Sequence, residues 1–186
     1  KHQKYLHQQI DKNRWSVLVC HRRFGKTVCM INHLIKSALT CKEKNPRFAY
    51  VAPTFKQAKS IAWDYMKQFT DKIPNTKFNE TELRVDLPNG ARITLLGSDS
   101  PDGLRGIYLD GCVIDEYANV NSRLFPEVIR PALSDRKGYC VFIGTPAGMN
   151  NNFYELYQHA NGADDWFNYK AKASDTKIVD EDELVK

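Results

Sequence analysis

An eight-residue segment near the start of the chain, residues 20–27 (CHRRFGKT), constrains the fold more than any other part of the sequence. It follows an apolar run and precedes a stretch in which apolar residues recur at helical spacing. A glycine, four free positions and then Gly-Lys-Ser/Thr form the phosphate-binding loop that joins a strand to a helix. Gly25, Lys26 and Thr27 match this pattern, whereas Cys20 replaces the first glycine. The segment therefore predicts a strand, a phosphate-binding loop and a helix.

Each matching residue has a physical use in such a loop. Gly25 lets the backbone approach phosphate oxygens, and the free N–H groups of the first helical turn point at them. The ammonium group of Lys26 can reach the β- and γ-phosphates of a nucleotide, and the Thr27 hydroxyl can ligate Mg²⁺. Two further cations, Arg22 and Arg23, lie inside the loop.

The composition is that of one soluble globular domain, because 186 residues with 42% hydrophobic and 26% charged residues can bury a core of ordinary size. No apolar run approaches the roughly 18 residues of a membrane span and no signal peptide opens the chain, so we expect a cytosolic protein. The five cysteines contain no C-x-x-C pair, which predicts reduced, mostly buried thiols. The net charge of +5 is too small to establish nucleic-acid binding.

Apolar runs rich in β-branched and aromatic residues alternate with segments of helical spacing. Strands are predicted at 16–20, 47–52, 112–115 and 139–144, with a fifth at 166–171, and helices at 26–39, 55–69, 122–134 and 152–159. This alternation is typical of βαβ units, and it predicts an α/β fold with a mainly parallel sheet flanked by helices.

One segment departs from the βαβ pattern. Residues 82–87 and 91–96 alternate in character on either side of Pro88-Asn89-Gly90. They predict a hairpin with a tight Asn-Gly turn, which would add antiparallel strands to the parallel sheet.

A second candidate for chemistry is the short apolar strand that ends in Asp115 and Glu116. Side chains alternate along a strand, so the two carboxylates point differently. One can hold Mg²⁺ through a water molecule while the other polarises an attacking water. Because ligands bind at the carboxyl ends of strands in open α/β sheets, this pair and the phosphate-binding loop predict one shared site. The combination indicates an ATPase.

Two weaker motifs accompany it. The strand at 139–144 runs into Thr145 and Pro146, where the hydroxyl could sense a γ-phosphate or the turn could simply stop the strand. Arg105 stands between glycines in a polar loop, within residues 103–106. It could reach a phosphate held by a neighbouring subunit and stabilise the transition state, or it could form a local ion pair on the surface.

Together these motifs resemble the ATPase domain of the large terminase subunit, the motor that packages double-stranded DNA into the capsids of tailed phages. The resemblance covers most of the chain and explains the unusual loop, since such motors carry a small residue in place of the first glycine and an arginine before Gly-Lys-Ser/Thr. Cys20 and Arg22 match those two features. The resemblance implies a RecA/ASCE-type P-loop NTPase fold and ATP with Mg²⁺ as the bound species.

The resemblance also implies roles for individual residues. Glu116 would be the catalytic base, Arg105 a finger acting in trans, and Arg22 a γ-phosphate contact beside Lys26. The residues expected at the nucleotide are Gln3, Arg22, Arg23, Phe24, Gly25, Lys26, Thr27, Val28 and Thr145, and those expected at Mg²⁺ are Thr27 and Asp115. Gln3 would read the adenine edge, although a glutamine near a chain end is also often only solvated. No separate role is implied for Arg23.

By the same resemblance, residues 1–175 form the ATPase domain, and residues 176–186 begin a linker to a C-terminal RNase H-like nuclease domain. The acidic residues at 180–183 lack the strand context of a nuclease site, so we expect no nuclease activity from this chain. The implied partners are double-stranded DNA, the portal protein, the small terminase subunit and further copies of the chain in a ring, a pentamer in the motor and a monomer as an isolated domain. The implied location is the host cytoplasm, transiently on the procapsid portal, without membrane contact.

Two other functions fit part of the sequence. A helicase-like DNA-dependent ATPase also has a Gly-Lys-Thr loop and an Asp-Glu strand, but it needs a second RecA-like domain, and its Asp-Glu motif continues to a histidine where this chain has Tyr117-Ala118. A nucleotide-binding scaffold without hydrolysis would have no need of Glu116.

Overall fold

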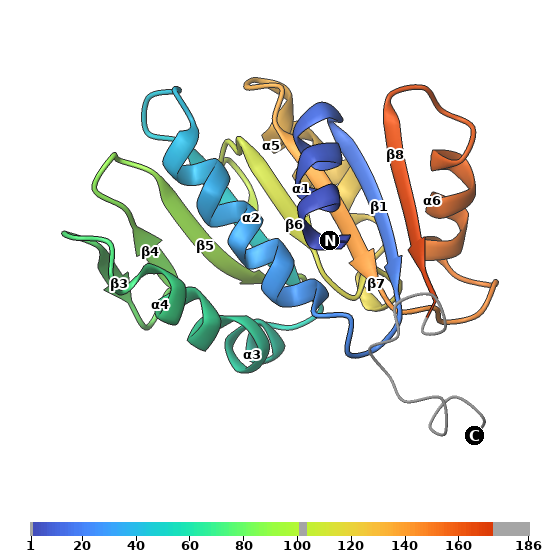
Figure 1. The fold of residues 1–186 in the computed structure, drawn as a ribbon, viewed down its shortest axis with the longest axis horizontal. Helices are drawn as coiled ribbons and strands as arrows, with labels where there is room; N and C mark the ends of the chain where they lie inside the picture. Colours follow the sequence, from blue (N-terminus) through green and yellow to red (C-terminus); the bar gives the residue numbers. More distant parts are fainter. Residues whose placement is uncertain (1, 101–103, 173–186) are drawn as a thin grey trace.

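The structure, a computed structural model, describes residues 2–100 and 104–172, and within them eight strands form one sheet in the order β3-β4-β5-β2-β6-β7-β1-β8 (Figure 1). The strands are β1 Trp15–Cys20, β2 Arg47–Ala52, β3 Lys77–Asn79, β4 Arg84–Asp86, β5 Arg92–Gly97, β6 Gly111–Ile114, β7 Tyr139–Gly144 and β8 Trp166–Ala171. All pairs from β5 to β8 are parallel, and the two pairs that involve β4 are antiparallel. The predicted α/β class is confirmed. The predicted linker at 176–186 and Gly103 of the arginine motif lie outside the described residues.

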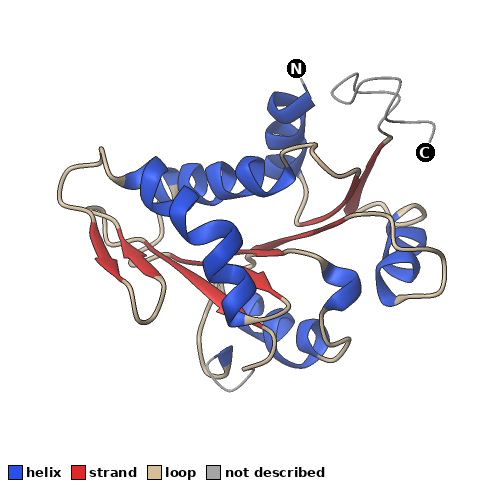
Figure 2. Cartoon of the chain, turned by 90° about the horizontal axis from the view of Figure 1, so that it is seen from below, coloured by secondary structure: helices blue, strands red, loops and turns tan. Residues whose placement is uncertain are grey.

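Helices cover the sheet on both sides (Figure 2). One face carries α1 His2–Lys12, α2 Lys26–Thr40, α3 Phe55–Ala58, a π-helical turn Lys59–Trp63 and α4 Asp64–Thr70. The other carries a 3₁₀ turn Tyr117–Asn119, a π-helical turn Phe125–Ile129, α5 Arg130–Ser134 and α6 Asn152–Ala160. None of the described helices combines the length and the hydropathy needed to cross a membrane.

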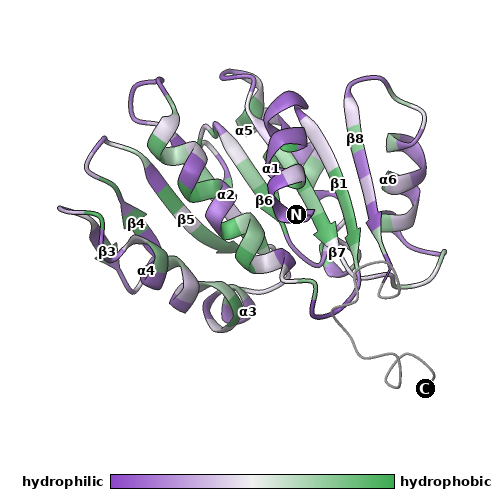
Figure 3. Ribbon diagram, viewed as in Figure 1, coloured by the Kyte–Doolittle hydropathy of each residue, from purple (hydrophilic) through white to green (hydrophobic). Residues whose placement is uncertain are grey.

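The central strands are apolar because both of their faces are covered. Every residue of β1 and β6 is buried, and the sheet centre is the most hydrophobic part of the molecule (Figure 3). Toward the edge this changes, since β5 alternates between buried residues such as Ile93 and Leu95 and partly exposed ones such as Arg92 and Thr94. The sheet centre therefore consists of continuous apolar strands, whereas β5, next to the antiparallel β4, alternates between buried and partly exposed residues.

The predicted hairpin forms from β4 and β5, with Val85 opposite Ile93. Its tight turn includes Asn89 and Gly90. A three-residue loop, 88–90, closes it, with the Gly90 N–H donating to the Leu87 carbonyl at 3.1 Å and Gly90 at φ +86°. Such loops place a left-handed residue after a type I turn. The predicted addition of an antiparallel hairpin to the parallel sheet is confirmed, and β5 joins the hairpin to the sheet by running parallel to β2.

Two elements were not predicted, and one predicted helix is shorter than expected. Helix α1 is mostly polar, and only Leu6 and Ile10, one turn apart, are buried. Strand β3 has three residues, too few for a clear alternating pattern. In the helix predicted at 122–134, residues 122–123 form a turn and the π-helical turn interrupts regular α-helix before α5.

Candidate active site

The sequence motifs meet at one edge of the sheet because β1, β6 and β7 are parallel neighbours (Figure 1). Strand β1 ends at Cys20 and α2 begins at Lys26, as the phosphate-loop pattern predicts. Gly25, just before the helix, has φ +78°, a left-handed conformation that glycine adopts without strain. Strands β6 and β7 end at Ile114 and Gly144, so the residues that follow them lie at this same carboxyl edge.

Asp115 is buried, with 3% of its surface exposed, and it is held by donors from three parts of the chain. Its Oδ2 accepts from the Thr27 hydroxyl at 3.3 Å and from the Tyr50 hydroxyl, and its Oδ1 accepts from the Glu116 N–H at 2.8 Å. Burial raises the pKa of the Asp115 carboxyl above its usual range, and the Tyr50 hydrogen bond opposes that shift. The carboxylate is thus oriented toward the first turn of α2.

Glu116 leaves the strand in a left-handed conformation, with φ +46° and ψ +49°. Simple alternation would send its side chain to the face opposite Asp115, and this backbone turn directs it along the sheet edge instead. Its Oε1 lies 3.4 Å from the Lys26 Nζ, and its Oε2 accepts from the Thr145 hydroxyl at 3.4 Å. A non-glycine residue in this region costs on the order of 1–3 kcal/mol, and such residues cluster at functional sites.

Cys20 lies at the end of β1, where the usual loop has glycine, and it is fully buried. Burial raises the pKa of its thiol to about 12, so at neutral pH the residue carries no negative charge beside the loop. The prediction of mostly buried cysteines is confirmed, since only Cys41 is partly exposed. Arg22 and Arg23 are exposed in the loop, and Arg23 has φ +64°.

The other residues expected at a nucleotide surround the loop. Phe24 is 4% exposed and its ring lies against Tyr169, 6.4 Å between centroids, so its side chain anchors the loop. Gln3, on α1, reaches the loop: a Cβ placed on Gly25 would lie 3.3 Å from the Gln3 Nε2. Val28 is partly exposed in the first turn of α2.

Arg105 lies apart from this group. It is exposed on a turn that follows the buried Leu104. It lines a cavity of about 160 Å³ together with Ser98, Arg123 and Glu127, none of which belongs to the cluster around Lys26 and Glu116.

Sequence reasoning missed Tyr50, which we had taken only as part of a buried strand. The residue is fully buried on β2 and donates to Asp115. A signal was present, because a tyrosine within an otherwise apolar buried strand requires a partner for its hydroxyl.

Comparison with known proteins decides the family. The family described as "Terminase large subunit, T4likevirus-type, N-terminal" matches residues 19–184. The chain belongs to this family of large terminase subunits. The resemblance carried by the loop, the Asp-Glu strand and the arginine motif is therefore confirmed.

Two curated large terminase subunits are similar to the chain, those of Thermus phage G20c and Thermus virus P23-45. Each is 30% identical over 126 residues, which is 58% of this chain and 26% of the relative. The matched part thus spans about a quarter of the length of these relatives.

Solved terminase structures share the fold. The large terminase ATPase domain of Thermus phage P74-26 superposes with a TM-score of 0.74 at 21% identity, covering 91% of this chain and 80% of that one. The large terminase of another thermophilic bacteriophage, solved in complex with ATP-γ-S, gives a TM-score of 0.77 at 15% identity, covering 98% of this chain and 47% of that one. These likenesses confirm the predicted P-loop NTPase architecture.

Proposed function

We propose that this chain is the ATP-hydrolysing domain of a large terminase, with hydrolysis at the carboxyl edge of β1, β6 and β7. One observation carries the proposal: Lys26 and Thr27 of the loop lie 3.4 and 3.3 Å from the adjacent carboxylates Glu116 and Asp115. The large terminase of a thermophilic bacteriophage has been solved with ADP and with ATP-γ-S, which supports a nucleotide as the ligand. A nucleotide-binding scaffold would not need this second carboxylate.

In this proposal the loop holds the phosphates. Backbone N–H groups of residues 24–28 point at the phosphate oxygens from the start of α2, and Lys26 and Arg22 supply cations to the β- and γ-phosphates. Gln3, whose Nε2 would lie 3.3 Å from a Cβ placed on Gly25, would read the adenine edge in this proposal. Arg23 shares the positive charge of the loop without a separate role.

Mg²⁺ fits the donors at this edge. In proteins it prefers oxygen ligands and usually binds through one or two carboxylates, phosphates and retained waters. Thr27 and Asp115 present such oxygens side by side, so Thr27 would ligate the ion and Asp115 would hold it through a water. When bound, the ion would neutralise charge that develops on the β- and γ-phosphate oxygens.

Glu116 acts as the base in the proposed mechanism. The Glu116 carboxylate pairs with Lys26 and accepts a hydrogen bond from Thr145. A γ-phosphate would draw the Lys26 ammonium away, which frees the Glu116 carboxylate to accept a proton from the attacking water. The water oxygen bonds to the γ-phosphorus, the bond to the bridging oxygen breaks, and ADP leaves with that electron pair. Thr145 then reports the loss of the γ-phosphate through its contact with Glu116.

The test is Glu116→Gln, which keeps the shape and removes the base. We expect turnover to fall by about 10²–10⁴-fold while ATP binding, measured with a fluorescent analogue, persists. Glu155→Gln changes an exposed glutamate on α6 and serves as the matched control. Unchanged turnover in Glu116→Gln would contradict the assignment of the base.

We further propose that hydrolysis drives translocation of double-stranded DNA into procapsids, in a ring, with a pentamer as the motor, that contacts the portal protein and the small terminase subunit. Membership of the large terminase family supports this proposal, and Arg105 lies on an exposed turn. DNA translocation would then take place in the host cytoplasm at the procapsid portal. Turnover per chain should rise with protein concentration, and Arg105→Ala should abolish the rise. A rate independent of concentration would place the arginine in cis.

A further inference from the structure

The strand next to the Asp-Glu strand contributes a residue to the candidate site for which the family resemblance supplied no role. We propose that Tyr50 is a positioning residue for the Mg²⁺ site, and that its hydroxyl sets the orientation of the Asp115 carboxylate. This inference rests on the function proposed above, because it concerns how the same site holds its metal.

The strand register brings the two side chains together. Tyr50 lies opposite Val113 on the parallel neighbour β6, and Asp115 follows two residues later, so alternation puts both side chains on the α2 face of the sheet. The Asp115 N–H donates to the Val51 carbonyl at 2.8 Å, which continues the ladder one step beyond the strand. The backbone of Asp115 is therefore fixed to β2, the strand that also carries the Tyr50 ring.

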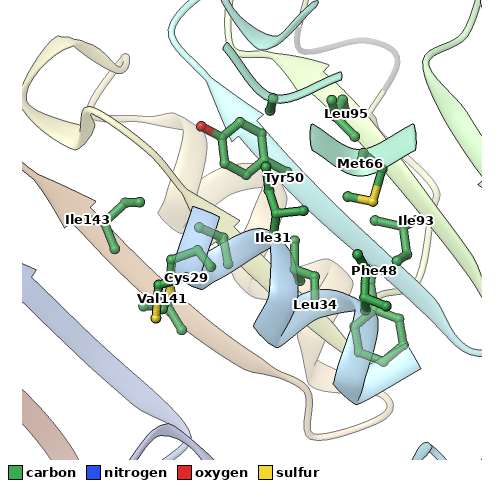
Figure 4. Packing of buried hydrophobic residues seen from close by; sticks show 14 of the residues in the cluster. Cys29, Ile31, Leu34, Phe48, Tyr50, Met66, Ile93, Leu95, Val141 and Ile143 are labelled. Atoms are coloured by element: carbon green, nitrogen blue, oxygen red, sulfur yellow. The ribbon is translucent and has the colours of Figure 1, made fainter. Parts of the chain in front are cut away.

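Packing fixes the position of the Tyr50 hydroxyl, just as the ladder hydrogen bond fixes the backbone of Asp115. The Tyr50 ring is fully buried in the cluster under α2, and Figure 4 shows its oxygen at the end of the ring that points away from Ile31 and Leu34. A ring enclosed in this way has few alternative rotamers, so the donor has one position. The Tyr50 hydroxyl donates to Oδ2 of Asp115, while the Glu116 N–H donates to Oδ1. Two donors on different oxygens leave the carboxylate one orientation, facing Thr27.

The need for a hydroxyl separates this role from simple packing. A phenylalanine would fill the same space in the core without a buried polar group that needs a partner. The tyrosine instead gives a buried metal-site carboxylate a donor from outside its own strand. Outer partners of this kind typically change metal affinity or activity by about 10–100-fold when removed.

The chain offers a matched control in Tyr139. It also lies on a strand of the sheet, β7, and its hydroxyl donates to the Ser37 Oγ at 2.9 Å. Tyr139 begins its strand, so it lies at the edge of the sheet opposite the candidate site. Tyr139→Phe thus removes a comparable hydrogen bond without touching Asp115.

The experiment titrates the chain with Mn²⁺ in the presence of ADP and follows free Mn²⁺ by electron paramagnetic resonance. We expect Tyr50→Phe to raise the half-saturating Mn²⁺ concentration about tenfold, Tyr139→Phe to leave it within about twofold, and thermal unfolding to show both variants folded. In an Asp115→Asn background, Tyr50→Phe should add less than a twofold change, because the residue acts through Asp115.

Three results would overturn the inference: an unchanged Mn²⁺ half-saturation in Tyr50→Phe, an equal shift in Tyr139→Phe, or a full tenfold effect that persists in the Asp115→Asn background. Failure of the proposed function is distinguishable, because then the unaltered chain would either bind no Mn²⁺ with ADP or bind it without turning over ATP.

Discussion

Two polar clusters lie along α2, and they differ in whether their side chains are charged. The edge cluster consists of Lys26, Thr27, Asp115, Glu116 and Thr145, at the first turn of the helix. The histidine cluster consists of His7 on α1 with Cys29 and His33 on α2, further along the same helix. Both join α2 to other elements, the first to strand ends and the second to α1.

The histidine cluster is closed and neutral. The Nδ1 atoms of His7 and His33 are 2.9 Å apart, the two rings are stacked with centroids 5.1 Å apart, and the Cys29 Sγ lies 3.8 Å from the His7 Nε2. His33 is 1% exposed, and burial lowers its pKa to about 4. Asp11 and Lys36 lie at its border, paired with each other at 2.5 Å.

The edge cluster keeps its charges. Lys26 and Glu116 face each other at the surface of the sheet edge, and Asp115 carries a raised pKa together with three donors. An unpaired buried charge is costly, so an arrangement of this kind persists where it serves a ligand. Helix α2 thus contributes a buried contact with α1 at one point, and at another it contributes Lys26 and Thr27 to a charged site.

The largest expected effect is a loss of ATP turnover on substitution in the edge cluster. Asp115→Asn is expected to lower ATP turnover by roughly 100-fold or more, since even indirect changes at metal sites reach that size. Stability should stay the same or rise, because a carboxyl with a raised folded-state pKa costs free energy when it ionises at neutral pH. Turnover and thermal unfolding measured on the same samples check this. Asp165→Asn, at an exposed position, is the control, and a marked loss of stability in Asp115→Asn would show a structural role instead.

The next effect should appear in the pH dependence of folding. The folded-state pKa of His33 lies below its usual value near 6.5, so the unfolded chain binds more protons between pH 6.5 and 4. The stability that His33 contributes is fully present above pH 6.5. It is lost as the pH falls, by up to about 3 kcal/mol of unfolding free energy near pH 4. Urea unfolding at about pH 7.5 and about pH 5.5 would measure the slope, which should shrink in His33→Leu and remain in His159→Gln. An equal slope in all three chains would contradict the prediction.

The smallest effect concerns the border of the histidine cluster. The side chains of Lys36 and Asp11 are 47% and 45% exposed, so water and salt screen their ion pair. Lys36→Met keeps most of the stem and should cost less than about 1 kcal/mol of unfolding free energy, with a smaller cost at high salt. Denaturant titrations at low and high ionic strength measure it. A cost above that, insensitive to salt, would make the pair part of the buried cluster.

The sequence predicted those parts of the site that depend on local pattern. The strand before Cys20, the helix from Lys26 and the pair Asp115-Glu116 follow from hydrophobic periodicity and motif spacing, and parallel strands bring their ends to one edge. The roles proposed for Gln3 and Arg105 remain predictions.

Other parts could not be predicted from neighbouring residues. Helix α1 is held by Leu6, Ile10 and the His7–His33 contact, in which residues 26 positions apart meet only after the chain folds. The positive φ of Glu116 depends on the path that the chain takes after β6, and the folded sheet defines that path. The three-residue hairpin loop depended on the register between β4 and β5.

By itself, then, the sequence determined the order of the central strands and of the helices that connect them, the loop chemistry at Gly25, Lys26 and Thr27, and the family to which the chain belongs. Only the tertiary structure decided that Tyr50 meets Asp115, that Lys26 pairs with Glu116, and that two histidines join α1 to α2. The physical reason is that periodicity and motifs encode backbone conformation over a few residues. Contacts between side chains depend on which strands and helices become neighbours, and the packing of the whole sheet decides that.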